Sequence, residues 1–297
     1  MRIGFLLALA VLASCGRTDR FAALRASVEE REARVPGAVV GVYLHDLSDD
    51  ATFSYRADSL FHAASTMKVP VMIEYFRALE AGRLDSAATL RLENRFASVV
   101  DGSPYTLDAG DDSDSSLYAR VGQDVPVREL VERMITRSSN LATNAVIGLL
   151  RADSAQATAR ALGAKTMVVA RGVEDGKAFE AGIINRTSAT DLGQLLDAIV
   201  LDRAASPAYS QAMLGILERQ EFSEEIPAGL PAGTRVAHKT GWITGVLHDA
   251  AIVFPPGGRP PFILVVLTRG IPDQKIARAI IQDVARDAWA AVVGPTT

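Results

Sequence analysis

The sequence carries its β-rich segments at its two ends and a long helical stretch between them. Near the N-terminus, residues 38–56 form two β-rich runs joined by a polar turn, which predicts a hairpin. Near the C-terminus, three short runs separated by Gly/Pro turns, at 235–240, 248–254 and 262–268, predict an antiparallel meander. A sheet made from these strands must be assembled from both chain ends. We therefore expect an α+β fold, in which an antiparallel sheet flanked by helices carries an inserted all-helical lobe.

The composition argues against several classes of protein. With 297 residues and 48% hydrophobic content, the chain can bury a large core, and 22% charged residues is ordinary for a globular protein. A formal net charge of −4 without a basic stripe argues against nucleic-acid binding. The four histidines form no H-x-x-H or H-x-H pair, and the body of the chain has no thiol. We therefore expect neither a metal site of the common ligand types nor a cofactor.

The one cysteine, Cys15, follows a segment typical of a secretory signal. Arg2 precedes the apolar run 3–12, which is too short for a membrane span of about 20 apolar residues. The sequence Leu12-Ala13-Ser14-Cys15 resembles a bacterial lipobox, in which the cysteine is lipidated and becomes the new N-terminus. We expect an exported lipoprotein on the periplasmic face of a bacterial membrane. Ordinary cleavage nearby, giving a soluble periplasmic protein, is the alternative.

A serine and a lysine stand one helical turn apart, where the apolar segment 69–73 begins. In a helix, Ser65 and Lys68 would share one face. A serine hydroxyl becomes a good nucleophile only when a neighbouring base takes its proton, and a lysine can be that base if its pKa is lowered. The helix N-terminus adds positive potential where an oxyanion would develop. Alone, S-x-x-K is a weak signal, so its meaning depends on the rest of the chain.

Two further polar motifs follow, one on a loop and one at a strand end. Ser138-Ser139-Asn140 interrupts two helical stretches, so its side chains can face a cleft from a short loop. Lys239-Thr240-Gly241 ends the predicted strand at 235–240. Singly, the first could be an N-cap and the second a strand running into a turn. Three such motifs in this order, at a helix start, between helices and at a strand end, are hard to obtain by chance.

Together these motifs resemble the signatures S-x-x-K, S-D-N and K-T-G of the penicillin-recognising serine enzymes, class A β-lactamases and penicillin-binding proteins. The resemblance is closest to the class A β-lactamase-like serine hydrolases, although Ser139 replaces the aspartate of the second motif. It implies two lobes with the active site between them. The implied segments are a signal and lipobox at 1–15, a catalytic domain at 20–297, an α/β lobe at about 20–60 and 222–297, and a helical lobe at about 61–221.

The resemblance also implies the roles of the motif residues. Ser65 attacks an acyl carbonyl while its proton leaves toward Lys68, and the backbone N–H groups of Ser65 and Trp242 form the oxyanion hole. Ser138 relays a proton to the leaving nitrogen. Lys239 adds a positive field that helps keep Lys68 neutral. The implied substrate-binding residues are Asn140, Lys239, Thr240, Gly241 and Trp242, with Asn140 on the substrate amide and Lys239 and Thr240 on its carboxylate.

Residues 161–186 show little periodicity and predict a long structured loop, a kind of segment that is usually functional. The resemblance implies that this loop carries the glutamate that activates water to release the acyl group. The family's E-x-x-L-N pattern is absent, and Glu174 is the best-placed carboxylate. We predict Glu174 as the base, with Asp175 and Glu180 as the alternatives.

Residues 101–116 combine several aspartates with Gly, Ser and Pro. Their spacing lacks the alternation, the glycine and the later glutamate of a calcium loop. We therefore predict a solvated surface insertion.

These features predict a serine β-lactamase-like hydrolase that works through an acyl-enzyme on Ser65. Its substrate would be a small-molecule β-lactam or a cell-wall peptide, and we expect a monomer that meets the membrane only through its lipid. One alternative is a penicillin-binding DD-peptidase or esterase that releases the acyl group slowly. The other is a non-catalytic cell-wall-binding lipoprotein, against which the retention of Lys68, Ser138 and Lys239 argues.

Overall fold

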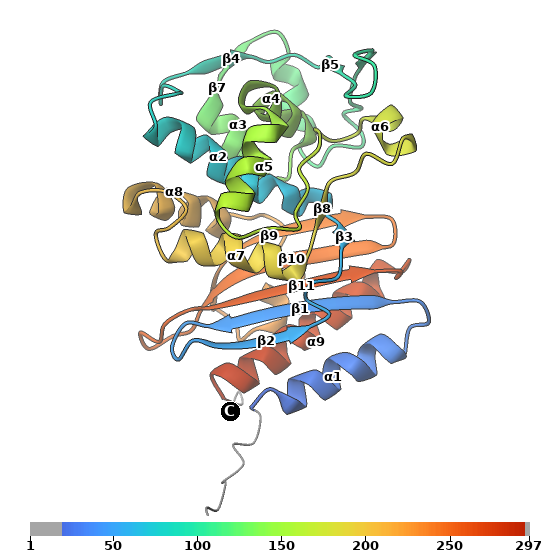
Figure 1. Cartoon of the computed structure of the whole chain (residues 1–297), viewed down its shortest axis with the longest axis vertical. Helices are drawn as coiled ribbons and strands as arrows, with labels where there is room; N and C mark the ends of the chain where they lie inside the picture. The colour runs from blue at the N-terminus through green and yellow to red at the C-terminus, as the bar shows by residue number, and fades with distance from the viewer. Residues whose placement is uncertain (1–19, 295–297) are drawn as a thin grey trace, which may run out of the picture.

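A five-stranded antiparallel sheet lies between two sets of helices in the computed structural model, which describes residues 20–294 (Figure 1). Its strand order is β2-β1-β11-β10-β9. The strands are β1 (Val39–Asp46), β2 (Ala51–Tyr55), β9 (Arg235–Ile243), β10 (Val246–Phe254) and β11 (Phe262–Arg269). The N-terminal hairpin joins the C-terminal meander through β1 and β11, where Val42 lies opposite Val266. The predicted α+β class and the assembly from both chain ends are confirmed.

Strand β11 is apolar along most of its length because helices cover both faces of the sheet. Leu264 and Val266 belong to the core that contains residues of α1 (Ala22–Ala33) and α9 (Gln274–Val292), whereas Val265 joins the core on the opposite face. Successive side chains of a strand point to opposite faces, so this strand must be apolar at nearly every position. Each such Val or Leu contributes about 1.5–3 kcal/mol when fully buried.

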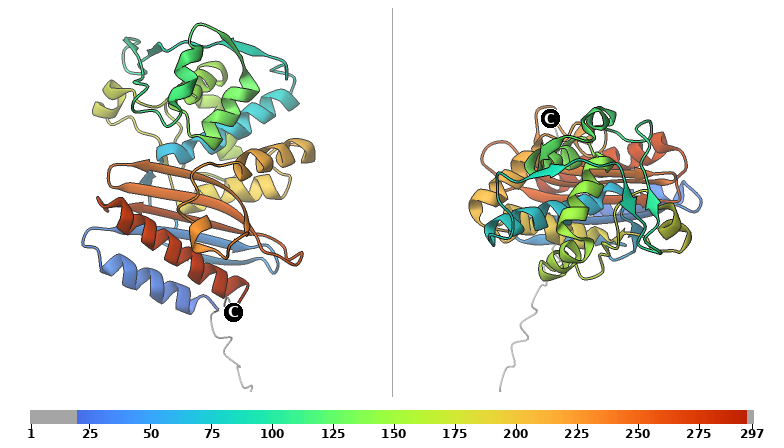
Figure 2. Two further views of the ribbon diagram at one scale, coloured as in Figure 1. Left: turned by 180° about the vertical axis from the view of Figure 1, so that it is seen from behind. Right: turned by 90° about the horizontal axis from the view of Figure 1, so that it is seen from above.

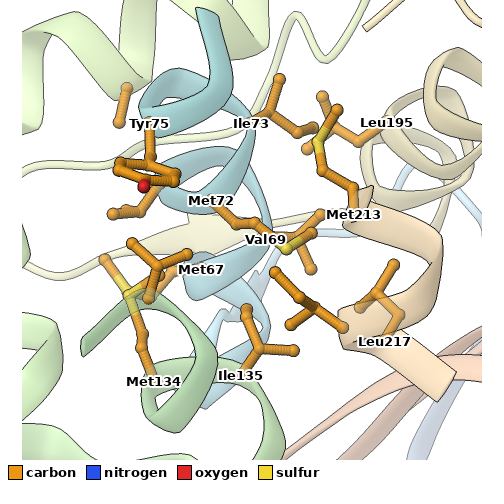
Figure 3. Close-up of a cluster of buried hydrophobic side chains, with 14 of the residues drawn as sticks. Met67, Val69, Met72, Ile73, Tyr75, Met134, Ile135, Leu195, Met213 and Leu217 are labelled. Atoms are coloured by element: carbon orange, nitrogen blue, oxygen red, sulfur yellow. The ribbon is translucent and has the colours of Figure 1, made fainter. Parts of the chain in front are cut away.

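The helical part of the chain is built around α2, the helix that follows Ser65. Figure 3 shows its side chains in a buried cluster, in which Met72 lies among Ile135, Leu195 and Met213 from three other helices. Because α2 is buried on most of its circumference, its N-terminal end is held in place by the core. The helices here are α2 (Lys68–Glu80), α3 (Val127–Thr136), α4 (Asn140–Leu150), α5 (Ala152–Ala161), α6 (Gly176–Glu180), α7 (Ala189–Val200) and α8 (Pro207–Glu218).

Short elements connect these helices. The two-stranded pairs are β3 (Phe61–His62) with β8 (Arg186–Thr187), β4 (Thr89–Arg91) with β7 (Asp124–Pro126), and β5 (Phe96–Ala97) with β6 (Pro104–Tyr105). The 3-10 turns are η1 (Ala64–Met67), η2 (Ser115–Arg120) and η3 (Pro227–Gly229). The pair β3 and β8 ties the segment before Ser65 to the segment that follows the long loop.

The predicted helical lobe, 61–221, includes two helices that also pack on the sheet. Helix α7 packs against β1, β10 and β11, and α8 packs against β9, so both cover the sheet (Figures 1 and 2). The contact with α7 is close: a Cβ on Gly193 would lie 2.2 Å from the ring of Tyr43. The sheet needs an apolar layer on this face, and α7 and α8 supply it.

The predicted signal segment and Cys15 lie outside the described residues. Within residues 20–294, no helix is long and apolar enough to cross a membrane.

Candidate active site

Ser65 lies in the 3-10 turn η1, directly before α2. The turn is held by short local hydrogen bonds: the backbone N–H of Ala64 donates to His62 Nδ1 at 3.0 Å, and Thr66 Oγ1 donates to the carbonyl of Ala63 at 2.6 Å. Lys68 is the first residue of α2, and its side chain is completely buried. Ser65 and Lys68 therefore lie where a helix begins, as the sequence predicts. In the structure, Lys68 Nζ donates its hydrogen bonds to Ser138 and Asn140 rather than to Ser65.

Gly241 allows β9 to approach this turn. A Cβ at position 241 would lie 2.9 Å from the backbone nitrogen of Ser65, closer than real Cβ atoms come, and 3.0 Å from that of Thr66. The third motif lies within β9, which continues to Ile243. The next residue, Trp242, is 54% exposed. Because Gly241 has no side chain, the C-terminal strand β9 can contact the backbone of the predicted nucleophile.

The two motif lysines meet at the hydroxyl of Ser138. Lys68 Nζ lies 3.2 Å from Ser138 Oγ, and Lys239 Nζ lies 3.1 Å from the same atom. Lys68 Nζ also donates to the carbonyl of Ser138 at 2.6 Å, and Lys239 Nζ donates to the carbonyl of Thr240 at 2.8 Å. A hydroxyl between two amines can accept from one and donate to the other, so this arrangement can move a proton.

Burial controls the charge of both amines. It lowers the pKa of Lys68 to about 7, against the opposing effect of the Asp112 and Glu174 carboxylates. Burial also lowers the pKa of Lys239 far below its usual value, and repulsion from Lys68 lowers it further. A neutral amine is therefore accessible near neutral pH, as a general base requires. Desolvation is thus the cause that lowers the pKa of Lys68, and the field predicted for Lys239 stays a prediction.

Asn140 links this buried pair to Glu174. Its Oδ1 accepts a hydrogen bond from Lys68 Nζ at 2.9 Å, and its Nδ2 donates to Glu174 Oε1 at 2.5 Å. Desolvation by partial burial raises the pKa of the Glu174 carboxyl, and the negative charges of Asp111 and Asp112 raise it further. The hydrogen bond from Asn140 and the positive charge of Lys68 act in the opposite direction. Glu174 can therefore accept a proton at a pH closer to neutral than an ordinary glutamate.

A cavity of about 560 Å³ opens beside these residues. Four predicted site residues line it: Ser65, Asn140, Glu174 and Trp242. Thr240 instead lines a neighbouring cavity of about 480 Å³, which Trp242 also borders. Lys68, Ser138 and Lys239 are buried, and the hydrogen bonds described above connect them to Asn140. Among residues 20–294, no group of three or more His, Cys, Asp or Glu side chains could hold a metal ion.

Three non-glycine residues at this site have left-handed backbone conformations. Their φ angles are 45° at Ala64, 55° at Ser138 and 59° at Glu174. Each costs about 1–3 kcal/mol and persists only where the surrounding structure enforces it. Ala64 directly precedes the predicted nucleophile, Ser138 carries the hydroxyl between the two lysines, and Glu174 carries the carboxylate of the loop.

Asn144, which the sequence analysis did not single out, anchors the loop that carries Glu174. Its Oδ1 accepts from the backbone N–H of Val173 at 2.6 Å, and its Nδ2 donates to the carbonyl of Val173 at 3.0 Å. A Cβ on Gly172 would lie 2.3 Å from Asn144 Oδ1, so glycine is required beside this contact. The available signal was the spacing: Asn144 lies four residues after Asn140 and therefore on the same face of α4.

The base of the loop is closed by a second amide. Asn185 Oδ1 accepts from the backbone N–H groups of Ala170 and Arg171 at 2.8 and 3.2 Å, and its Nδ2 donates to the carbonyl of Arg171 at 3.0 Å. Arg171 Nε donates to the carbonyl of Ile183 at 2.7 Å. The predicted long loop is therefore a closed loop that contains the short helix α6.

The two alternative bases make other contacts, although Asp175 lines the same cavity as Glu174. Asp175 is buried and already accepts hydrogen bonds from Ser98 Oγ at 2.9 Å, from the backbone N–H of Val99 at 3.0 Å and from that of Ala178 at 3.1 Å, which makes it the N-cap of α6. Glu180 is exposed at the end of α6. Of the three carboxylates, only Glu174 is hydrogen-bonded to Asn140.

Most residues of the predicted solvated insertion at 101–116 are exposed, but the prediction was wrong for Asp112 and Asp114. Asp112 and Asp114 are 7% and 3% exposed, since both serve as hydrogen-bond acceptors inside the structure. Asp114 pairs with Arg133 of α3 at 2.8 Å. Asp112 accepts hydrogen bonds from the first two backbone N–H groups of α4, those of Asn140 and Leu141. A carboxylate of this loop is thus part of the support of the site.

The comparisons with known proteins identify the family. A family model described as the β-lactamase enzyme family matches residues 22–292. A β-lactamase from Streptomyces fradiae is 29% identical over 258 residues, which cover 85% of this chain and 81% of that protein.

Solved structures show the same fold. A β-lactamase from Sphaerobacter thermophilus is 27% identical with a TM-score of 0.76, over 93% of this chain and 99% of its own. PBP-A is 26% identical with a TM-score of 0.78, over 91% of this chain and 96% of its own. The chain belongs to the β-lactamase enzyme family and is a class A β-lactamase-like serine hydrolase.

Proposed function

We propose that this enzyme is a β-lactamase (EC 3.5.2.6) that opens the β-lactam amide through an acyl-enzyme on Ser65. The observation that carries the proposal is the convergence of the three motifs: Lys68 Nζ and Lys239 Nζ lie within 3.2 Å of Ser138 Oγ, beside a cavity that Ser65 lines. Burying two amines costs desolvation free energy, and binding to the cell wall alone does not require buried amines. This favours chemistry over non-catalytic binding to the cell wall.

In the proposed acylation these groups act in turn. Ser65 Oγ attacks the lactam carbonyl carbon, and its proton passes to the neutral amine of Lys68. The negative charge on the carbonyl oxygen is stabilised by the backbone N–H groups of Ser65 and Trp242. The C–N bond then breaks, and the leaving nitrogen takes the proton of the Ser138 hydroxyl, which Lys68 replaces. The product is an ester on Ser65.

Release requires water and a second base. Glu174 accepts a proton from water as the water oxygen attacks the ester carbonyl. The bond to Ser65 Oγ breaks, and that oxygen receives the proton that Glu174 took from water, so both groups return to their starting protonation states. The raised pKa of Glu174 and its place on the cavity wall support this assignment.

The closest rival is a penicillin-binding peptidase or esterase that acylates but releases slowly. The likeness to PBP-A favours keeping it as the second candidate, because a PBP-A variant is described as an acyl-enzyme complex with penicillin G. The presence of Glu174 on the cavity wall favours fast release instead.

Pre-steady-state turnover of a chromogenic cephalosporin tests the proposal, because it separates acylation from release. Wild type should show continued turnover without accumulating acyl-enzyme, and Ser65→Ala should show neither burst nor covalent labelling by fluorescent penicillin. Ser113→Ala, a change at another serine on the cavity wall, serves as the matched control and should keep its label. Persistent acyl-enzyme in wild type would favour the peptidase, and equal labelling of Ser65→Ala would exclude Ser65 as the nucleophile.

We also propose that the chain is exported and lipidated on Cys15. The support is the apolar run 3–12 followed by Leu12-Ala13-Ser14-Cys15. Cys15→Ser should move the protein from the membrane fraction to the soluble fraction while its turnover of the cephalosporin is unchanged. A wild-type protein whose mass shows no lipid adduct would exclude this anchor.

A further inference from the structure

The first turn of α4 has backbone donors that need acceptors from outside the helix. The first N–H groups of a helix have no intrahelical partner. Ser139 Oγ accepts only the N–H of Ala142, at 3.2 Å. The N–H groups of Asn140 and Leu141 remain, and this turn directly follows Ser138, whose backbone is in the strained left-handed conformation.

Asp112 supplies the missing acceptors from the acidic loop. Its carboxylate accepts the N–H of Asn140 at 3.0 Å and that of Leu141 at 2.8 Å. The backbone N–H of Asp114 donates to the same carboxylate at 2.9 Å, and the hydroxyl of Tyr118 donates at 3.1 Å. Because the side chain is 93% buried by these contacts, leaving 7% exposed, the loop and the helix are fixed to each other.

The backbone that Asp112 fixes belongs to the residue that joins the two reacting groups. Asn140 Oδ1 accepts from Lys68 Nζ at 2.9 Å, while Asn140 Nδ2 donates to Glu174. A shift of this turn would therefore move Asn140 relative to both. Misplacement of about 1 Å can cost about a hundredfold in rate.

We propose that Asp112 is a positioning residue of this acyl-transfer site: it holds the start of α4 so that Asn140 spans Lys68 and Glu174, and it supplies the negative charge that the second motif lacks at Ser139. The inference rests on the proposed function and deepens it. It gives the acidic loop, which resembles a surface insertion in sequence, a place in the chemistry.

The charge of Asp112 has an effect that a purely structural contact would lack. Lys68 is faced by Asp112 and Glu174 and, across Ser138, by Lys239. Glu174 is faced by Asp112, Asp111 and Lys68. In both cases Asp112 raises the pKa of its neighbour. Removing its charge should therefore lower the pKa of Lys68 and that of Glu174. In a pH–rate profile, the acid limb is the range in which the rate falls as the pH is lowered. The acid limbs of acylation and of release should both move to lower pH.

The matched pair of variants is Asp112→Asn and Asp108→Asn. Asp108 is an exposed acid of the same loop, and it caps only the backbone N–H of Gly110 at 2.7 Å. Asp112→Asn should slow acylation by about ten- to a hundredfold and shift its acid limb to lower pH. Asp108→Asn should leave both as in wild type. An acid limb at the wild-type pH in Asp112→Asn would overturn the inference, even if the variant is less stable.

A direct measurement does not need turnover. Lysine is rare in the sequence (Lys68, Lys165, Lys177, Lys239 and Lys275), so 13C-labelled lysine gives few signals to titrate by NMR. The midpoint of Lys68, assigned with Lys68→Met, should fall in Asp112→Asn and stay in Asp108→Asn. An unchanged midpoint in Asp112→Asn would overturn the charge effect.

A further variant covers the case in which Asp112→Asn fails to fold. Asp112→Glu keeps the charge and displaces it by one methylene, so acylation should slow while the Lys68 midpoint stays near that of wild type. Acylation by Asp112→Glu at the wild-type rate would overturn the positioning role. Wild type that never acylates would refute the proposed function, whereas the NMR midpoints would still report on Asp112.

Discussion

The two sides of the cavity are held in different ways. On one side, Lys68 and Lys239 are completely buried, on a helix and a strand that form part of the packed core. On the other side, Glu174 lies on a loop whose attachment depends on polar side chains such as Asn144 and Asp175. A hydrogen bond contributes only about 0.5–1.5 kcal/mol net, far less than a buried helix face.

This difference indicates that release of the acyl group is easier to disrupt than its formation. The groups for forming the acyl-enzyme move only if the core moves, whereas the group for releasing it can be displaced by opening one loop. Loops with few apolar contacts open at lower free energy than core elements. We therefore expect damage to the loop to leave acylation intact and convert the enzyme into a slow, penicillin-trapping protein.

The largest effect should follow removal of the amine on the buried side. Lys68→Met removes the base and the hydrogen bonds to Ser138 and Asn140. Acylation should fall by about ten-thousand-fold, the upper end for a positioned general base. Stopped-flow measurement of the acylation rate checks this, with the exposed Lys165→Met as control. Acylation within tenfold of wild type would remove Lys68 from its role.

Glu174→Gln breaks the other side of the comparison. The amide cannot take a proton from water, so release should slow by about a hundred- to a thousandfold while the acylation burst is kept. Mass spectrometry of the quenched reaction should then detect the ester on Ser65. Glu180→Gln, on the exposed end of α6, is the matched control. If Glu180→Gln released the acyl group slowly and Glu174→Gln released it at the wild-type rate, Glu180 would be the base.

Asn144→Ala should separate the two sides without touching either reacting group. It removes both hydrogen bonds to Val173 and frees the loop. Release should slow by up to about a hundredfold, with a smaller effect on acylation. Asn94→Ala is the control, because Asn94 makes the same paired contact with the backbone of Leu107 away from the cavity. Equal slowing of both steps in Asn144→Ala would contradict the division.

The pH dependence of acylation should give the smallest effect. Burial lowers the pKa of Lys68 to about 7, so the lysine loses its proton, and becomes a base, as the pH rises through about 7. Acylation should therefore increase about tenfold between pH 6 and pH 8, since the neutral fraction rises from about a tenth to about nine tenths. A rate that falls over this range would show that the ammonium form is the active one.

The sequence allowed prediction of the parts that local spacing determines. Ser65 and Lys68 are one turn apart, and the β-rich ends of the chain require a shared sheet, so motif and fold class followed from the residues alone. The meeting of Lys68, Ser138 and Lys239 was expected only through the resemblance, because nothing local brings residue 239 to residue 138.

Tertiary contacts account for what was missed. Asp112 belongs to a segment whose composition is that of a solvated loop, and only the folded structure brings it to the start of α4. Likewise, nothing local in the sequences of α7 and α8 reveals that they pack against the sheet as well as against the core around α2. Asn144 was accessible in principle, since helical spacing places it on the face of Asn140.

The order of the strands has a consequence for how the enzyme comes into being. Ser65 is made early, but Gly241, which brings β9 against its backbone, and Lys239 belong to the last quarter of the chain. A nascent chain can form its first hairpin and some helices, yet β1 must wait for β11 to complete the sheet. A truncated product ending before β9 therefore carries the nucleophile without its catalytic surroundings. Activity can appear only when synthesis is nearly finished, and premature termination yields no partly active enzyme.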